Sequence, residues 1–199
     1  MNENPTKSVD LRVKKTRMTL QKAFMELMSE RDFQSITVRD ITERAMVNRA
    51  TFYDHFVDKY ALMYSGIREW FANTLQEKTG GIIEKTPENL AALIELTCEF
   101  LAQLRHHCLP KTGDALPMVQ SQITTILTES LAKCSGDTTH GLQRDSAPLK
   151  ATMAAWAIYG AALYWSQYAP AESIQKFVAR VLPSIIENLD VRPILQPTR

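Results

Sequence analysis

Glycine is scarce in this sequence, the net charge is close to zero and no cysteine motif is present. Seven glycines against eight methionines among 199 residues disfavour glycine-rich phosphate loops and turn-rich β-sandwiches. A formal net charge of +1 neither requires nor excludes a polyanionic partner. Hydrophobic residues make up 45% of the chain, which is typical of a globular protein and too many for a disordered one. At about 150 residues per domain, the length predicts one or two compact units.

The three cysteines, Cys98, Cys108 and Cys134, are widely spaced and form no CxxC pair. Such an odd set predicts reduced thiols in a cytosol rather than a disulfide framework. The N-terminus has no apolar signal-peptide core. Residues 151–171 carry no charge, but they are rich in alanine and include Pro170, which favours a helix buried against other helices over a membrane span. We therefore expect a soluble, cytoplasmic protein without a membrane segment.

Apolar residues recur with helical spacing along the chain, and no segment alternates like a strand, so the expected fold class is all-α. Helix starts are marked by Thr37 with Asp40 at capping-box spacing, by Asn48, by Asp58 and by Thr86 before Pro87. We expect an N-terminal three-helix helix-turn-helix domain over residues 9–58, a helical effector-binding and dimerisation domain over 59–190, and a tail over 191–199. The expected helices are about 9–30, a short one after Thr37, 49–56, 59–78, 87–107, 115–133, 147–168 and 170–189, the last two joined by a very tight turn.

The second short helix of the N-terminal domain, from Arg49 to Phe56, has an unusual surface. Phe52 and Phe56 share one face, which must turn inward onto the first helix and onto Ile41 and Ala45. The other positions hold short, polar or flat side chains, and a major groove admits a helix only if nothing bulky holds it off. These positions are Arg49, Ala50, Thr51, Tyr53, Asp54 and His55.

Residues 16–63 resemble the DNA-binding domain of the TetR/AcrR family of bacterial transcriptional regulators. The blocks ITVRDIT (36–42), NRATFYDHF (48–56) and DKYAL (58–62) stand in the order and spacing of that family without a gap. The resemblance covers about the first third of the chain, and the remainder matches only in being helical and of suitable length. It implies a homodimeric regulator that binds double-stranded operator DNA, and a repressor that a small apolar or aromatic effector releases.

The resemblance also implies DNA-binding roles for eight positions. Thr37 and Arg39 match positions that meet backbone phosphate and sometimes a base. Arg49, Ala50 and Thr51 match the leading recognition positions, Tyr53 a phosphate-contacting position, His55 a phosphate or base-edge position, and Lys59 the lysine that touches phosphate. Two physical arguments agree: a cation at a helix N-terminus favours an anion there, and a bidentate Arg49–guanine pair is worth ~1–3 kcal/mol of discrimination.

Two positions depart from the family pattern. Met46 stands where a small turn residue, often glycine, is usual. Asp54 places an acid on the presumed DNA face, where it accepts from cytosine, repels phosphate or pairs with a nearby arginine; we expect the intramolecular pair. The basic run from Leu11 to Lys22, which holds no acid, fits a solvated helix face as well as a phosphate-facing one.

The last two helices are the expected dimer interface, because small residues allow close approach and the resemblance implies a four-helix bundle between subunits. The alternative is that they only fill the monomer core. The candidate interface residues are Ala155, Tyr159, Ala162, Phe177, Val181 and Ile185. A pocket lined by aromatic and soft side chains suits the expected effector, although such stripes also build plain core. The candidate pocket residues are Trp70, Phe71, Phe100, Met118, Trp156 and Tyr159.

Rival chemistry is weakly represented. His106, His107 and Cys108 suggest zinc, but adjacent helical side chains diverge by about 100° and no second ligand pair is visible. Cys108 or Cys134 as a redox sensor lacks an activating environment. No GxSxG elbow, phosphate-binding loop or dinucleotide fingerprint appears, so we expect no enzyme, no cofactor and no metal. Two alternative functions stay open: a helical interaction protein without operator binding, and a small helical metalloprotein.

Overall fold

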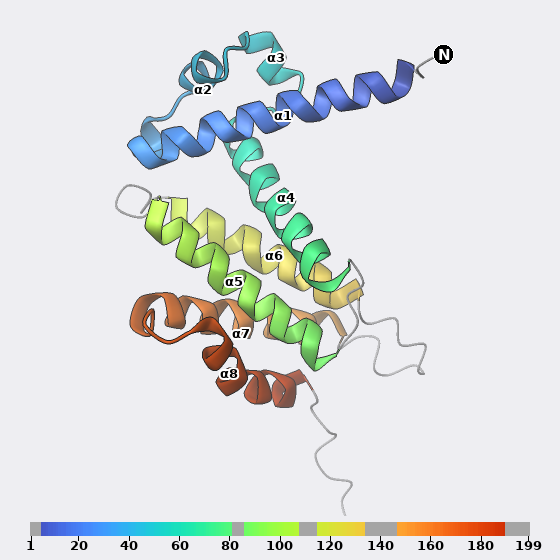
Figure 1. The fold of residues 1–199 in the computed structure, drawn as a ribbon, viewed down its shortest axis with the longest axis vertical. Coiled ribbons are helices and arrows are strands. Elements are labelled where there is room, and N and C mark those ends of the chain that lie inside the picture. The colour runs from blue at the N-terminus through green and yellow to red at the C-terminus, as the bar shows by residue number, and fades with distance from the viewer. Residues whose placement is uncertain (1–4, 81–85, 108–114, 134–146, 190–199) are drawn as a thin grey trace, which may run out of the picture. The chain divides into compact units, whose positions relative to one another are not determined.

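The computed structural model describes residues 5–80, 86–107, 115–133 and 147–189. Within these ranges every regular element is a helix, which confirms the all-α fold class (Figure 1). The elements are α1 (Pro5–Glu30), η1 (Phe33–Ser35), α2 (Val38–Ala45), α3 (Arg49–Tyr53), α4 (Lys59–Thr79), α5 (Pro87–His107), α6 (Leu116–Lys133), α7 (Ala147–Tyr168) and α8 (Ile174–Leu189).

Local side-chain caps explain where four of these helices begin. The Thr37 hydroxyl accepts from the Asp40 backbone N–H (3.2 Å) while Asp40 Oδ2 accepts from the Thr37 N–H (2.8 Å), a complete capping box at the start of α2. Asn48 accepts from Thr51 N at the start of α3 (2.7 Å), and Asp58 accepts from Ala61 N at the start of α4 (2.7 Å). Thr86 caps α5 through the N–H of residue 89. All four predicted caps are confirmed.

Three predicted helix boundaries are wrong, and the first is the start of α1, which lies at Pro5 instead of residue 9. The structure ends α3 at Tyr53 instead of Phe56, and it begins α8 at Ile174 instead of Pro170, so the connection from α7 is longer than the expected tight turn. Trp165 fastens that connection, because its indole N–H donates to the Glu172 carbonyl (2.9 Å). The predicted tail (191–199) lies outside the described residues, as do Cys108 and Cys134.

The chain divides into two compact units. The first spans Met1–Glu69 with His106–Val119, and the second spans Trp70–Arg105 with Gln120–Arg199. The functional boundary predicted after residue 58 stays a prediction, since packing units need not coincide with functional domains.

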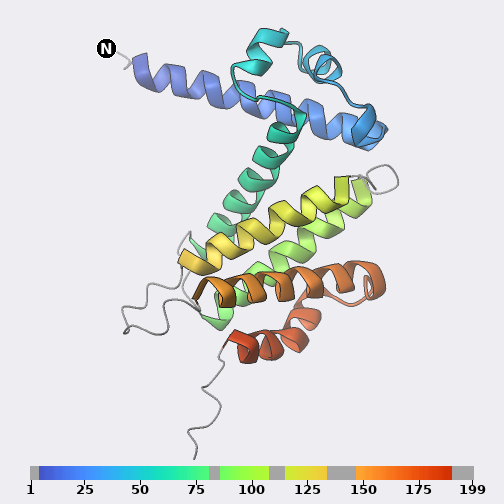
Figure 2. The same cartoon turned by 180° about the vertical axis from the view of Figure 1, so that it is seen from behind.

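The core of the first unit lies where α1, η1, α2, α3 and the start of α4 meet. The predicted stripe of α1 is buried, and so are the core anchors Phe33 and Ile36 and the inward-facing Phe52 and Phe56. Figures 1 and 2 both show α2 and α3 together on one side of α1. The stripe comprises Leu20, Ala23, Phe24, Leu27 and Met28, all 4% exposed or less. Burying these side chains holds the helix-turn-helix on its supporting helix.

The second unit is a helical layer in which α8 packs against α7 (Figure 2). Lys78 on α4 pairs with Glu95 (3.3 Å) and Glu99 (3.0 Å) on α5, and the Arg105 guanidinium donates to the Ser166 carbonyl at the end of α7. Among the helices that the structure describes, none has the length and apolarity that a membrane span requires.

Candidate nucleic-acid interface

Helix α3 presents a thin, exposed surface backed by a buried aromatic anchor. Arg49 and Ala50 are exposed, Tyr53 is 56% exposed, and Thr51 is half-buried, whereas Phe52 is fully buried. The Tyr53 ring meets the edge of Phe52 at 5.4 Å between centroids, which limits the orientations of the tyrosine. The three predicted recognition positions and the predicted phosphate-contacting Tyr53 therefore lie together on an accessible helix. His55, just beyond α3, is half-buried beside Phe56 (6.4 Å).

The N-terminus of α2 presents Thr37 and Arg39 to solvent, as a phosphate contact requires. Both side chains already have intramolecular partners. The Thr37 hydroxyl donates to Asp40 Oδ2 (2.6 Å), and Arg39 Nε donates to Glu43 Oε1 (2.6 Å), which raises the pKa of Arg39. The pair with Glu43 is exposed and therefore weak, so it leaves Arg39 available to an anion. The DNA roles of Thr37 and Arg39 stay predictions.

Lys59 has intramolecular partners in the structure, and its predicted contact with phosphate stays a prediction. Its ammonium donates to three backbone carbonyls, those of Phe33 (2.9 Å), Gln34 (3.1 Å) and Ile36 (2.8 Å). It also lies 4.6 Å from the centre of the Phe33 ring. Because an ammonium has three donors, the structure leaves none for phosphate. The sequence argument missed this because η1, which turns these carbonyls toward α4, has no sequence signature of its own.

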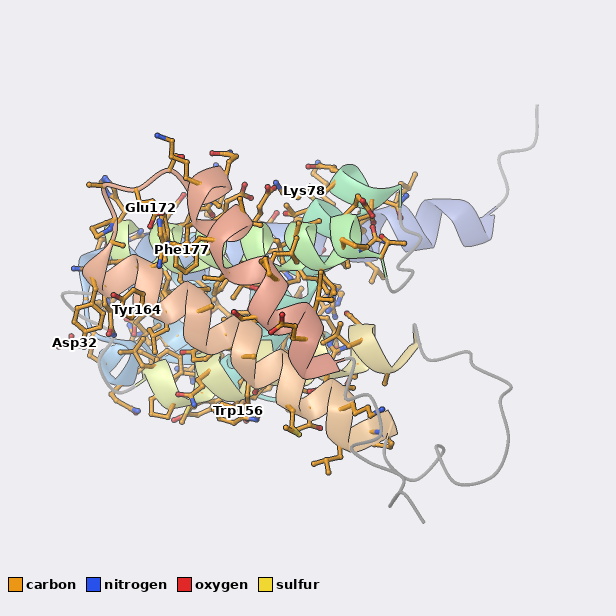
Figure 3. The ribbon with its side chains drawn as sticks, turned by 90° about the horizontal axis from the view of Figure 1, so that it is seen from below. Asp32, Lys78, Trp156, Tyr164, Glu172 and Phe177 are labelled. Atoms are coloured by element: carbon orange, nitrogen blue, oxygen red, sulfur yellow. The ribbon has the colours of Figure 1, made fainter. Side chains whose placement is uncertain are left out.

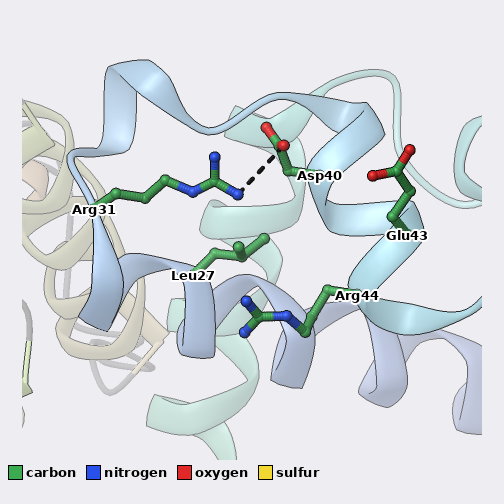
Figure 4. A pocket seen from close by; sticks show the side chains of 5 residues that line it. All are labelled: Leu27, Arg31, Asp40, Glu43 and Arg44. Carbon is green, nitrogen blue, oxygen red and sulfur yellow. Dashed lines mark ion pairs between the residues drawn. The ribbon is translucent and has the colours of Figure 1, made fainter.

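Ion pairs fasten α2 to the end of α1 around a small open hollow (Figure 4). Arg31 pairs with Asp40 (3.3 Å), and the two guanidinium nitrogens of Arg44 bind the two carboxylate oxygens of Glu30 (2.8 and 2.7 Å). A fork of this kind fixes both distance and angle. The hollow, which Leu27 and Glu43 also line, is part of the framework that orients the helix-turn-helix.

The two departures from the family pattern have clear structural settings. Met46 ends α2 in the left-handed region (φ 54°, ψ 42°) with 92% of its surface exposed, which explains why glycine is usual at this position. The predicted intramolecular pair of Asp54 is wrong, because no ion pair to Asp54 occurs within the residues described. Asp54 ends α3 as its C-cap.

The basic run on α1 is a solvent-exposed surface over its first part. Arg12, Lys14 and Lys15 are exposed, and α1 begins at Pro5, fifteen positions before its buried stripe starts at Leu20. Arg17 is different, since it is half-buried and lies 4.6 Å from the centre of the Phe56 ring. The run therefore combines free surface cations with one structural arginine.

The predicted pocket residues are only partly brought together. Trp70, Phe71 and Phe100 form a three-ring cluster in the second unit, with centroids 5.1–5.4 Å apart. Trp156 and Tyr159 form a separate pair at 6.5 Å, with Trp156 exposed and Tyr159 buried, and burial raises the pKa of Tyr159. Met118 belongs to the first unit. The three-ring cluster is the part of the predicted set whose members lie together, and its role in effector binding stays a prediction.

Most of the predicted dimer residues are buried within the single chain, and their role in a dimer stays a prediction. Five of the six are buried within the protomer, so a partner cannot reach them without unpacking the core, and only Val181 is partly exposed. The buried five are Ala155, Tyr159, Ala162, Phe177 and Ile185. Residues 151–171 are apolar on all sides, so periodicity alone does not show which side of the helix packs against the core of its own protomer.

The exposed side of α7 carries large apolar residues instead, which we call the α7 stripe. Trp156, Tyr164 and Tyr168 are 50%, 52% and 72% exposed, and Leu149 and Met153 extend the row toward the start of the helix. Figure 3 labels Trp156 and Tyr164 on α7, with Trp156 on the side away from Phe177. Their spacing of about four residues places these large side chains on one side of α7, but in a helix that is apolar on every side this spacing does not show which side is exposed.

The metal hypothesis finds no support among the residues described. No three side chains of His, Cys, Asp and Glu gather there as a metal site. The side chain of His107 and the whole of Cys108 lie outside the description. Cys98 is buried, and desolvation, together with Glu99 and Glu95, raises the pKa of its thiol to about 12. A thiol of this kind is neither a ready ligand nor a nucleophile.

Known proteins share this arrangement. Residues 21–64 match the model of the bacterial regulatory proteins of the tetR family. A stretch of 74 residues is 40% identical to an uncharacterised HTH-type transcriptional regulator, YxbF, of Bacillus subtilis (strain 168), covering 37% of this chain and 20% of that protein. The chain thus matches about a fifth of the length of this curated relative.

Two solved structures share the fold over most of both chains. A TetR-family regulator from Streptomyces coelicolor A3 covers 88% of this chain and 95% of its own, with 15% identity and a TM-score of 0.61. FadR from Bacillus subtilis, solved in complex with stearoyl-CoA, covers 86% and 98%, with 19% identity and a TM-score of 0.54. At these identities the likeness shows the fold alone.

The three N-terminal helices, with α3 exposed and Phe52 behind it, define a helix-turn-helix domain. Residues 21–64, which include the helix-turn-helix, are similar to the bacterial regulatory proteins of the tetR family. The predicted resemblance of the N-terminal domain to this family is therefore confirmed.

Proposed function

We propose that this protein is a DNA-binding transcriptional regulator that reads an operator through α3 in the major groove. The observation that carries the proposal is the exposed surface of Arg49, Ala50 and Tyr53 on a helix anchored by buried Phe52. Arg49 has no side-chain partner among the described residues and is free to form a bidentate pair with guanine. Ala50 lets the backbone approach the bases, and Tyr53 reaches the flanking phosphate.

Substitutions at these positions test the proposal on a duplex selected from a random-sequence library with the wild-type protein. Ala50→Leu places bulk on the face that enters the groove, and we expect at least a tenfold loss of operator affinity with unchanged folding. The matched control is Ala72→Leu, the same change at an exposed position of α4. Arg49→Ala loses about 10- to 100-fold by the bidentate magnitude and relaxes specificity at one base. Folded variants that bind like the wild type contradict the proposal.

We further propose that two copies associate through the α7 stripe. One helix-turn-helix buries little groove surface, and dimers gain affinity by occupying half-sites about one helical turn or a multiple apart. Rows of exposed aromatic residues of this length are unusual on a monomer surface. The stripe thus replaces the buried residues that the sequence suggested, while Val181 on α8 remains a candidate beside it.

Sedimentation or light scattering tests the dimer. We expect the wild type at twice the monomer mass and Trp156→Glu or Tyr164→Glu shifted toward the monomer, because a partner surface would bury the new charge. Met25→Glu is the matched control, since Met25 is an apolar α1 residue with 53% exposure outside the stripe. A monomeric wild type, or a stripe variant that stays dimeric, contradicts this interface.

The protein is proposed to act as a repressor in the cytoplasm, released by a small apolar or aromatic effector. The three-ring cluster of Trp70, Phe71 and Phe100 supplies the apolar chemistry, and the stearoyl-CoA bound to FadR gives an example of an apolar chain in this fold. A coupling of only ~1–3 kcal/mol between effector and operator suffices for release. Trp70 reports on this site by fluorescence once Trp156 and Trp165 are replaced by phenylalanine. Fatty acyl-CoAs and aromatic acids that quench it should also lower operator affinity.

The alternative is a helical interaction protein that has lost operator recognition. Asp54 at the end of α3, which has no ion pair among the residues that the structure describes, favours it, because an acid there repels phosphate. Failure of the selection with a folded wild-type dimer would support this alternative. Metal analysis of the purified protein tests the metalloprotein alternative.

A further inference from the structure

The ammonium of Lys59 occupies a cage built from three carbonyls and a ring. Two of these carbonyls, on Phe33 and Gln34, belong to η1, and the third belongs to Ile36, the residue before the α2 N-cap Thr37. The Phe33 ring closes the cage, and Tyr60 packs edge-on against that ring at 5.1 Å. Carbonyl oxygens and a ring face are all attracted by a compact cation.

Lys59 is the first residue of α4, so the cage joins two helix starts that are more than twenty residues apart in sequence. Ile36 N donates to the Phe33 carbonyl (3.2 Å), whereas the Gln34 and Ile36 carbonyls have Lys59 as their partner. Removing the ammonium leaves these acceptors without their donor, and the connector loses the contact that fixes Thr37 relative to α4. Burial also lowers the pKa of Lys59.

We infer that Lys59 is a positioning residue for operator binding: it sets the α2 N-terminus, and through α2 the recognition helix, by holding the 33–36 carbonyls rather than by contacting phosphate. The inference rests on the proposed function, since its readout is affinity for DNA. It differs from the role that family resemblance assigns to this lysine, and the two roles predict opposite results for one conservative substitution.

Lys59→Arg separates the two roles. A guanidinium is flat and spreads its donors over a fork, so it does not fit three carbonyls that converge on one point, but it binds phosphate at least as well as lysine. Positioning therefore predicts that Lys59→Arg and Lys59→Met both lose roughly tenfold or more in affinity. A phosphate contact predicts that Lys59→Arg binds like the wild type and only Lys59→Met weakens.

Salt dependence gives a second readout that a general loss of stability does not move. The slope of log affinity against log salt is negative, and each lost phosphate contact reduces its magnitude by about 0.9. Positioning predicts an unchanged slope for Lys59→Met with a lower affinity at every salt concentration. Lys22→Met, the same change at an exposed α1 position, controls for net charge.

The experiment uses full-length protein, the duplex selected by the wild type, and a temperature at which circular dichroism shows every variant folded. Lower affinity with an unchanged slope for Lys59→Met, together with weak binding by Lys59→Arg, supports the inference. A slope that falls by about one, wild-type affinity of Lys59→Arg, or unchanged affinity of Lys59→Met overturns it. If the wild type selects no duplex, the proposed function fails instead, so the two failures are distinguishable.

Discussion

Arg17 on α1 and Glu69 on α4 are joined by an ion pair of 3.2 Å across 52 positions of the sequence. The same guanidinium donates to Ser65 and stacks on the Phe56 ring, so one side chain links α1, α4 and the segment that follows α3. Burial alone raises the pKa of Glu69, but hydrogen bonds from Gln21, Ser65 and Arg17 bring it below its ordinary value.

Arg17→Met should lower the free energy of unfolding by about 1 kcal/mol. The change removes hydrogen bonds to a charged partner, but the pair is partly exposed and therefore screened. Urea denaturation followed by circular dichroism measures the difference. Arg12→Met is the control, because Arg12 is exposed and outside this network. Equal midpoints for the two variants would show that the link contributes nothing.

Met46→Gly should stabilise the protein by roughly 0.5–1 kcal/mol. The left-handed conformation costs a residue with a side chain ~1–2 kcal/mol, and the greater freedom of glycine in the unfolded chain offsets part of the gain. Because Met46 is 92% exposed, the change sacrifices no packing. Met46→Ala keeps the Cβ and should change the denaturation midpoint little. A glycine variant no more stable than the alanine variant is the contrary result.

Asp40→Asn should lower the free energy of unfolding at neutral pH and leave it unchanged in acid. Hydrogen bonds from the Thr37 hydroxyl and N–H lower the pKa of Asp40, with a smaller contribution from Arg31. A carboxyl whose folded pKa is lowered stabilises the protein above its unfolded pKa, and this stabilisation is lost as the pH falls through the folded value. The free energies of unfolding of the wild type and Asp40→Asn should therefore differ at pH 7 and be equal near pH 2.5. Asp32→Asn is the control, since the Asp32 side chain makes no cap bond.

Cys98 should resist thiol reagents until the protein unfolds. Its pKa of about 12 leaves almost no thiolate at pH 8, and the side chain is fully buried. In a protein that carries Cys108→Ser and Cys134→Ser, labelling by a chromogenic disulfide should follow the unfolding rate. Rapid labelling under native conditions would mean that the second unit opens locally.

Helix starts were predictable because their signals are local. Thr37, Asn48 and Asp58 each accept from an N–H three residues ahead, so sequence spacing alone contains the whole interaction. The buried stripe of α1 was predictable for a similar reason, since polar residues outline it.

The side of a helix that faces the core, and the contacts between residues far apart in the sequence, were not predictable. On α7 every side is apolar, so only the packing of neighbouring helices decides that Ala155 points inward and Trp156 outward. The intramolecular contacts of Lys59 were not predicted, because its partners are backbone carbonyls 23 to 26 positions earlier and every residue has a carbonyl. A turn in the folded chain brings such carbonyls together whatever the residue types at those positions are, so the sequence carries no sign of the site.

The caps of α2, α3 and α4 have a consequence for biosynthesis. Each cap joins residues only three apart, and the link from Arg17 to Glu69 is the longest of those described for the helix-turn-helix. By the time Glu69 has left the ribosome, every partner in these bonds exists, whereas the α7 stripe has not been translated. Since chains emerge N-terminal end first, the helix-turn-helix domain is able to fold on a nascent subunit before that subunit is able to dimerise.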